Sequence, residues 1–204
     1  LATRLYPFFV NETDAVNATT VNTMAQVYLA TGTNIKPMLR QLFISSEFRN
    51  SNNFFKRYSW PVEFAVRAIK ETGWSGYSVN NAITPLSNMG QNLYEPPDVN
   101  GWETGPGWFS TSSMLQRMNF ASSLSQNQRF NLARDATAHR QGPDRVLAYL
   151  TGRFQSIPFT PEASNAMLEY LRSGNGWTGT DAQLQTRIPG LTRLIVGCGE
   201  YQFV

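Results

Sequence analysis

The stretch MGQNLYEPPDVNGW, residues 89–102, ends a helical pattern and then places two prolines, a glycine and a tryptophan within seven residues. Pro96 and Pro97 fix their φ angles and remove two backbone donors. Gly101 permits a backbone conformation that other residues avoid, and Trp102 needs a large apolar surface to rest on. The sequence therefore predicts a loop of specified shape, and we expect it to be a rigid anchor among packed helices.

Apolar residues recur at helical spacing on both sides of this loop, and no segment alternates as a half-buried strand would. Helix starts are marked by capping residues or by proline at the first helical position. The expected starts are Thr13 or Asp14, Asn34, Pro61, Ser110 or Thr111, Pro143, and Thr160 with Pro161. The fold class we predict is all-α, an irregular multi-helix bundle with long loops rich in Pro, Gly and Trp.

The same spacing assigns faces to the helices. After Pro61, Glu63, Arg67 and Glu71 alternate in sign at four-residue intervals, which is typical of a solvent-exposed face. The last helix is expected to break near Pro189-Gly190. The residues expected to face inward are Ile35, Met38, Leu39, Leu42 and Phe43; Val62, Ala65, Val66 and Ile69; and Met114, Leu115, Met118 and Ala121.

The length of 204 residues suits one large domain or two small ones. We expect a single helical domain over residues 1–204. A polar stretch from Ser122 to Gly142 leaves open a subdivision into 1–124 and 140–204.

Composition narrows the function classes. Only 15% of the residues are charged, a low share that favours an exported protein, and the net charge is +3. The basic residues are scattered, so no nucleic-acid-binding stripe is predicted. No apolar stretch is long enough to cross a membrane, and no signal peptide is present. Because the chain opens at Leu1 in a helical pattern, we expect a processed product or a fragment.

Several segments together resemble the DUF1800 family. They are the Met-Gly-Gln-x-Leu-Tyr-Glu-Pro-Pro-Asp-Val-x-Gly-Trp loop, Gly107-Trp108, and Leu115-x-Arg117-x-Asn119-Phe120-Ala121. LYPFFV at 5–10 and FISSEF at 43–48 also resemble family segments, with Ser46 where the family usually has proline. The segment from Arg57 to Glu63 is similar to a further one, although residues 58–60 intervene.

The resemblance implies a large, mostly helical bacterial protein that is usually exported to the periplasm, outer surface or medium. This chain would be its C-terminal portion. Family members commonly occur beside a second exported family, DUF1501, so the resemblance suggests a DUF1501-type protein as a partner. The family has no established reaction, so no catalytic residue is carried over.

The usual catalytic and metal motifs are missing from the sequence. His139 is the only histidine and lies in a polar stretch with no nucleophile motif, so we interpret it as a surface residue. Cys198 is the only cysteine and follows an apolar run, which predicts a buried, inert thiol. No carboxylate calcium loop and no glycine-rich phosphate loop is found. No metal and no cofactor is therefore predicted.

The Pro/Trp-rich loop supports two opposed hypotheses. Acids beside aromatic platforms are typical of glycoside hydrolases, so Glu95, Asp98 and Glu103 could be catalytic. In the structural alternative, these acids cap helices or pair with arginines while the tryptophans fill the core. The candidate binding residues are Trp102, Trp108, Arg57, Arg67, Arg117 and Asn119, the last expected to hold the loop backbone by a hydrogen bond.

The leading hypothesis is a non-catalytic helical module of an exported protein, which binds a partner protein or a glycan in a cell-surface or periplasmic assembly. The first alternative is a hydrolase acting on an acidic polysaccharide, whose anionic groups Arg57, Arg67 or Arg117 would hold. The second alternative is an accessory subunit of a larger complex.

Overall fold

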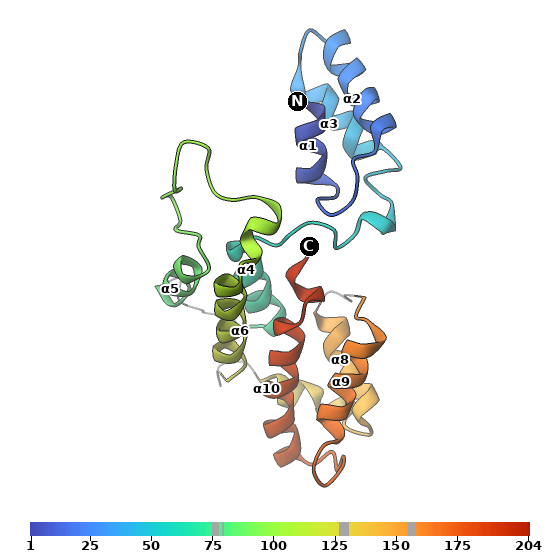
Figure 1. Cartoon of the computed structure of the whole chain (residues 1–204). Helices are drawn as coiled ribbons and strands as arrows, with labels where there is room; N and C mark the ends of the chain where they lie inside the picture. The colour runs from blue at the N-terminus through green and yellow to red at the C-terminus, as the bar shows by residue number, and fades with distance from the viewer. Residues whose placement is uncertain (75–77, 79, 127–130, 155–157) are drawn as a thin grey trace. The chain divides into compact units, whose positions relative to one another are not determined.

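The chain divides into two compact units, Leu1–Tyr58 with Phe203–Val204 and Ser59–Gln202. The structure is a computed structural model that describes residues 1–74, 78, 80–126, 131–154 and 158–204 (Figure 1). Within these residues every regular element is helical, and extended segments pair only at the isolated bridge Tyr58–Phe203. The predicted all-α class is thus confirmed. The single domain 1–204 and its subdivision at 124 and 140 stay predictions, whereas the compact units divide at residue 58.

The first unit contains α1 (Ala2–Phe9), α2 (Ala18–Ala30), α3 (Ile35–Ile44) and the short 3₁₀ helix η1 (Ser51–Asn53). Its core contains the buried side chains Tyr6, Met24, Met38 and Leu42. The Tyr6 hydroxyl donates to the Glu47 carboxylate over 2.6 Å, which satisfies a polar tip inside this core.

The caps of the first unit agree only partly with the sequence prediction. Asn34 caps α3 as expected, since its side chain accepts from the backbone N–H of Lys36. The cap of α2, however, is Asn17 and not Thr13 or Asp14. The reason is that the side-chain oxygen of Asn11 accepts from the backbone N–H groups of both Thr13 and Asp14. That turn occupies the residues that would otherwise start the helix.

The second unit contains all the remaining helices. They are α4 (Pro61–Thr72), α5 (Asn80–Asn88), η2 (Gly105–Phe109), α6 (Thr111–Ser125), α7 (Leu132–Asp135), η3 (Ala136–His139), α8 (Pro143–Arg153), α9 (Pro161–Arg172), α10 (Asp181–Gly197) and η4 (Glu200–Gln202). The predicted starts at Pro61, Ser110, Pro143 and Thr160 are confirmed. Helix α10 packs against both α6 and α9 and is the central helix of this unit (Figure 1).

Helix α10 is continuous through Pro189-Gly190, so the predicted break is wrong. A proline inside a helix removes one backbone hydrogen bond, and tertiary packing must offset that loss. Gly190 provides the packing, because the Tyr170 ring of α9 occupies the position that a Cβ on residue 190 would take. The absent side chain lets α9 and α10 approach closely.

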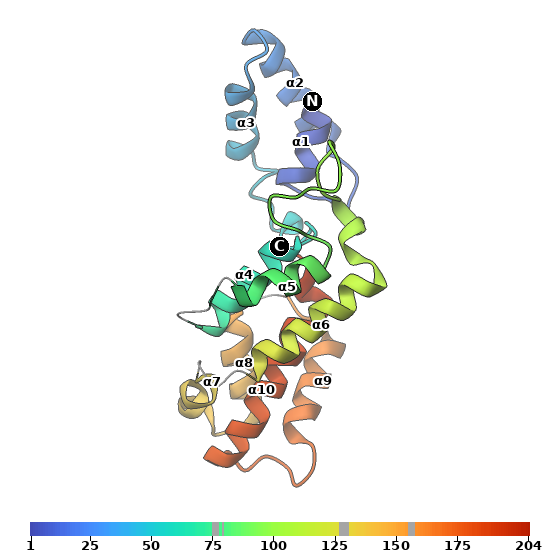
Figure 2. The same cartoon turned by 90° about the vertical axis from the view of Figure 1, so that its left-hand side faces the viewer.

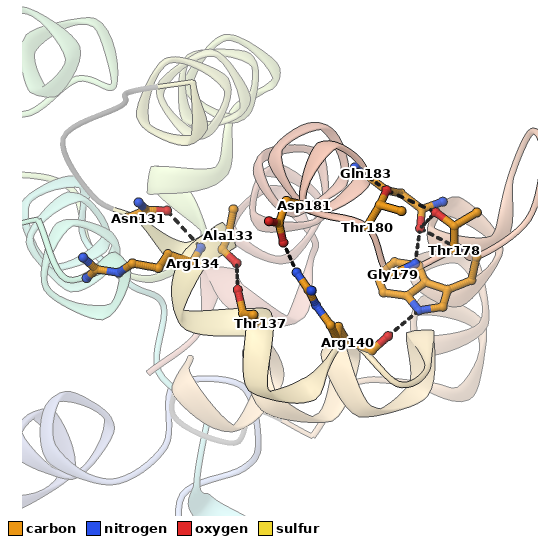
Figure 3. A network of polar contacts seen from close by, with 11 residues as sticks. Asn131, Ala133, Arg134, Thr137, Arg140, Thr178, Gly179, Thr180, Asp181 and Gln183 are labelled. Atoms are coloured by element: carbon orange, nitrogen blue, oxygen red, sulfur yellow. Dashed lines mark hydrogen bonds and ion pairs between the residues drawn. The ribbon is translucent and has the colours of Figure 1, made fainter.

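The polar segment before α8 is tied to the start of α10 by the contacts in Figure 3. The Arg140 guanidinium pairs with Asp181, and the Arg140 carbonyl accepts from the indole N–H of Trp177 over 2.9 Å. The Gln183 amide oxygen accepts from the backbone N–H groups of Thr178 and Gly179. Residues 131–142 of this polar stretch are therefore folded, although they lack an amphipathic pattern.

Some predicted inward faces are wrong. Ile35, Phe43, Val66, Leu115 and Met118 are exposed. On α6 the buried face consists of Ser113, Arg117, Phe120, Ala121, Leu124 and Ser125. The spacing is helical, but three of its positions are polar, so apolar residues alone do not identify it.

Candidate binding site

A buried ion pair lies on the face of α4 that was predicted to meet solvent. The side chains of Arg67 and Glu71 are both buried, with Nε and Oε1 3.5 Å apart. The Tyr201 ring lies under the guanidinium at 3.8 Å, and its hydroxyl donates to Glu71. Burial raises the pKa of the Glu71 carboxyl, although Tyr201 and Arg67 oppose the shift. The outward placement predicted for Arg67 and Glu71 is wrong because the C-terminal segment covers them.

Arg117 is the second buried cation, with 0% of its surface exposed. Its guanidinium donates to the Ser59 carbonyl over 2.7 Å and to the Gln202 amide oxygen over 3.2 Å. The Gln202 amide in turn donates to the carbonyls of Val196 and Cys198. Burial lowers the pKa of Arg117 to about 10, although the nearby Glu63 opposes the shift. Arg117 therefore joins the start of α4, helix α6 and the end of the unit.

These contacts bear on the arginines that were predicted to bind a ligand. Arg67 and Arg117 are occupied inside the unit, so neither is available to hold an anionic glycan. Arg57 belongs to the first unit, where its backbone exchanges hydrogen bonds with Val204. The predicted joint action of these arginines with the acidic loop therefore finds no support in the contacts of Arg67 and Arg117.

The loop between α5 and α6, residues 90–107, is fixed at its two ends; we call it the Pro/Trp loop. Met89 and Trp108 flank it and are both buried. The Ser113 hydroxyl of α6 lies 3.2 Å from the Met89 carbonyl and 2.8 Å from the Trp108 carbonyl. The buried amide of Gln91 accepts from the backbone N–H of Val62, which ties the loop to the start of α4. We call Met89, Gln91, Trp108 and Ser113 the loop base.

The body of this loop is exposed between the two ends. Every residue from 92 to 100 lies in solvent, and the segment extends away from α5 and α6 (Figure 2). Tyr94 is 94% exposed at a φ of 65°, a strained backbone region for an aromatic residue, and Val99 is fully exposed. The expectation of an anchor among packed helices therefore applies only to the base. The apolar tip was missed because the pattern suggested burial.

The candidate catalytic acids lie on the exposed part of the loop. Glu95, Asp98 and Glu103 are all exposed, and Asp98 also accepts from the backbone N–H of Asn100 over 2.7 Å, which is a turn contact. The two tryptophans differ. Trp108 is 3% exposed beside Trp60, with ring centroids 5.8 Å apart, whereas Trp102 is half-buried. Only Trp102 thus offers a platform next to the acids.

Three further residues named in the sequence analysis are Asn119, Cys198 and His139. Ser113, not Asn119, holds the loop backbone; Asn119 is exposed on α6. The half-buried Cys198 thiol donates to the Ile195 carbonyl, and burial raises its pKa to about 12, which keeps it protonated. His139 stacks on Tyr149 with centroids 4.4 Å apart.

Within the described part of the chain, no group of three or more His, Cys, Asp or Glu side chains could hold a metal ion. In the same residues no helix is both long and apolar enough to cross a membrane.

The protein is all-α. Its second unit presents a long loop whose base is buried and whose apolar tip is exposed. The family model described as "Protein of unknown function (DUF1800)" matches residues 1–203. The chain therefore belongs to the DUF1800 family. It matches no curated protein and no solved structure.

Proposed function

We propose that this chain is a non-catalytic module of an exported bacterial protein that binds a partner protein or a glycan through the Pro/Trp loop. The observation that carries the proposal is the exposed apolar tip, Tyr94 and Val99, on a loop whose base is buried. Residues 90–104 of this loop form no regular element, and a segment of that length without regular structure is usually functional in a compact protein. A rigid base lowers the entropy that binding must overcome.

The strained aromatic residue at the tip supports the same proposal. A non-glycine residue at positive φ costs free energy, and such residues concentrate at ligand-binding positions. Tyr94 combines this backbone with near-complete exposure. Tyrosine is also enriched among the residues that dominate binding energies at protein interfaces.

The candidate partner is an exported DUF1501-type protein, because members of the two families commonly occur together. Isothermal titration calorimetry of the purified chain with the DUF1501-type protein of the same organism tests this. We expect the double variant Tyr94→Ser/Val99→Ser to weaken binding by about tenfold or more, while helix content is unchanged. The matched control is Leu29→Ser, which removes an exposed apolar residue from the first unit.

The glycan form of the proposal is tested by the same variants on an array of bacterial polysaccharides. Binding that both tip substitutions leave unchanged, to the protein and to every glycan, would refute the assignment to this loop.

A hydrolase acting on an acidic polysaccharide is the second candidate. The observation in its favour is that Glu95, Asp98 and Glu103 are exposed on the same loop as the half-buried Trp102. Glu95→Gln and Asp98→Asn should then abolish release of reducing ends without changing the unfolding midpoint. Absence of turnover by the unaltered chain on acidic polysaccharides would exclude this candidate. An accessory-subunit role would instead show as binding that needs a third chain.

A further inference from the structure

A groove of about 620 Å³ lies along α10 between α6 and α9, away from the Pro/Trp loop in sequence and in its lining. The direction of α9 is fixed because the Thr160 backbone N–H and hydroxyl both donate to Glu200, beyond the end of α10. The two helices therefore run antiparallel. Ala163 on α9 and Gly197 on α10 are small, and such small residues keep the space between the helices open.

The lining is mostly apolar and adaptable. Met118 of α6 is exposed, Met167 of α9 is buried beneath the groove, and Tyr170 and Leu194 complete its apolar surface. Methionine side chains are flexible and polarizable, so they adjust to a ligand at low cost. The volume falls in the range of small-molecule sites, which are lined in this way with a few polar groups.

Arg193 is the one charged residue among the described residues that line the groove. Arg193 of α10 lines it and is exposed, and its guanidinium makes no hydrogen bond or ion pair to another residue in the described ranges. Asn119 and Ser122 add neutral hydrogen-bonding groups from α6, and the lining contains no acid. An unpaired guanidinium beside an apolar surface favours a ligand with an anionic head and an apolar body.

We propose that this groove binds an amphipathic anion with one aliphatic chain, such as a fatty acid, whose carboxylate pairs with Arg193 while the chain lies along Met118 and Met167. The aliphatic chain is removed from water against the two methionines and Leu194, which provides the apolar part of the affinity. The charge on Arg193 sets the preference for anions over cations. This site is distinct from the loop proposed to bind a partner, so either proposal can fail without the other.

The test is a titration of the full chain, labelled with ¹³C at its methionine methyls, with decanoate followed by NMR. Of the six methionines, Met118 and Met167 line the groove, whereas Met24 and Met38 lie in the first unit and are internal references. We expect saturable shifts of the two groove methyls and none of the references. Decyltrimethylammonium, with the same chain and a positive head, should bind far more weakly, and so should acetate.

Two variants separate the head from the chain. Arg193→Gln should weaken decanoate binding by about tenfold, as expected for loss of a charge-assisted hydrogen bond. Arg145→Gln, an exposed arginine on α8, is the matched control and should leave the affinity unchanged. Ala163→Leu should fill the groove and abolish the shifts; if it fails to fold, Arg193→Gln still decides the question.

Four results would overturn the proposal. They are no saturable shift, equal binding of the cationic amphiphile, parallel shifts of all six methyls, which indicate detergent action, and unchanged affinity in Arg193→Gln.

Discussion

Arg117→Ala should destabilise the second unit strongly. The substitution leaves two buried acceptors, the Ser59 carbonyl and the Gln202 amide oxygen, without their charged donor. An orphaned buried acceptor costs about 1–3 kcal/mol, so we expect a loss of about 4 kcal/mol. The cavity left by the side chain adds to this cost. Removing a buried charge, whose desolvation lowers the pKa of Arg117, is favourable and offsets about as much as the cavity adds.

Tryptophan fluorescence during guanidinium chloride unfolding measures this loss of stability in the second unit. All five tryptophans lie between residues 59 and 202, so the signal reports on the second unit alone. A loss of about 4 kcal/mol lowers the midpoint by roughly 1 M. The control Arg145→Ala removes an exposed arginine and should stay within about 0.5 kcal/mol of the parent.

A loss below about 1 kcal/mol in Arg117→Ala would refute the reasoning, because the two acceptors would then have found water or other donors. Arg117→Met adds a second comparison. It fills most of the volume and removes the charge, so its cost should be smaller than that of alanine but should not vanish.

Three further predictions concern α4, α10 and the C-terminal segment. Tyr201→Phe removes the donor to Glu71 and should cost about 1–3 kcal/mol in the same unfolding assay. The raised pKa of Glu71 means that the native state binds its proton more tightly than the unfolded chain does. Relative to Glu71→Gln, the parent should therefore gain stability as the pH falls from that raised native pKa toward 4.5; an advantage that instead grows with rising pH contradicts this sign. Gly190→Ala meets the Tyr170 ring and should cost about 1–3 kcal/mol, whereas Gly197→Ala on the same helix faces open space and should be neutral or stabilising. Equal effects of the two alanines in thermal unfolding would count against the close approach of α9.

Helix existence could be predicted from the sequence because caps and prolines act locally. Asn34, Ser110 and Thr160 each accept a hydrogen bond from a backbone N–H within three residues, so a short window contains the whole signal. Asn17 was missed because the competing turn at Asn11 uses the same kind of local contact.

The buried face of α4 could not be predicted in the same way. Arg67 and Glu71 show the four-residue charge alternation that normally marks a surface, and nothing near them in the chain indicates burial. Their cover is Tyr201, which lies 130 residues further along than Glu71. The Pro189-Gly190 error has the same origin, because Tyr170 on another helix makes the glycine favourable.

The location of the candidate site could be predicted from the sequence, but its exposure could not. The Pro/Trp loop was identified from its composition, but composition alone does not separate a buried corner from an exposed loop with a buried base. The residue that decides this is Ser113, whose spacing of three from the cap Ser110 is common to many helix starts.

Both ends of the Pro/Trp loop meet at the Ser113 hydroxyl, and this has a practical consequence for protein engineering. Sequence placed between Asp98 and Asn100 would emerge from solvent and return to it without crossing the core. The position is therefore suited to carrying a foreign epitope or a fluorescent reporter, since loop length adds only slowly to the entropy of closure. The protein could therefore be used as a helical scaffold that displays an inserted sequence on this loop.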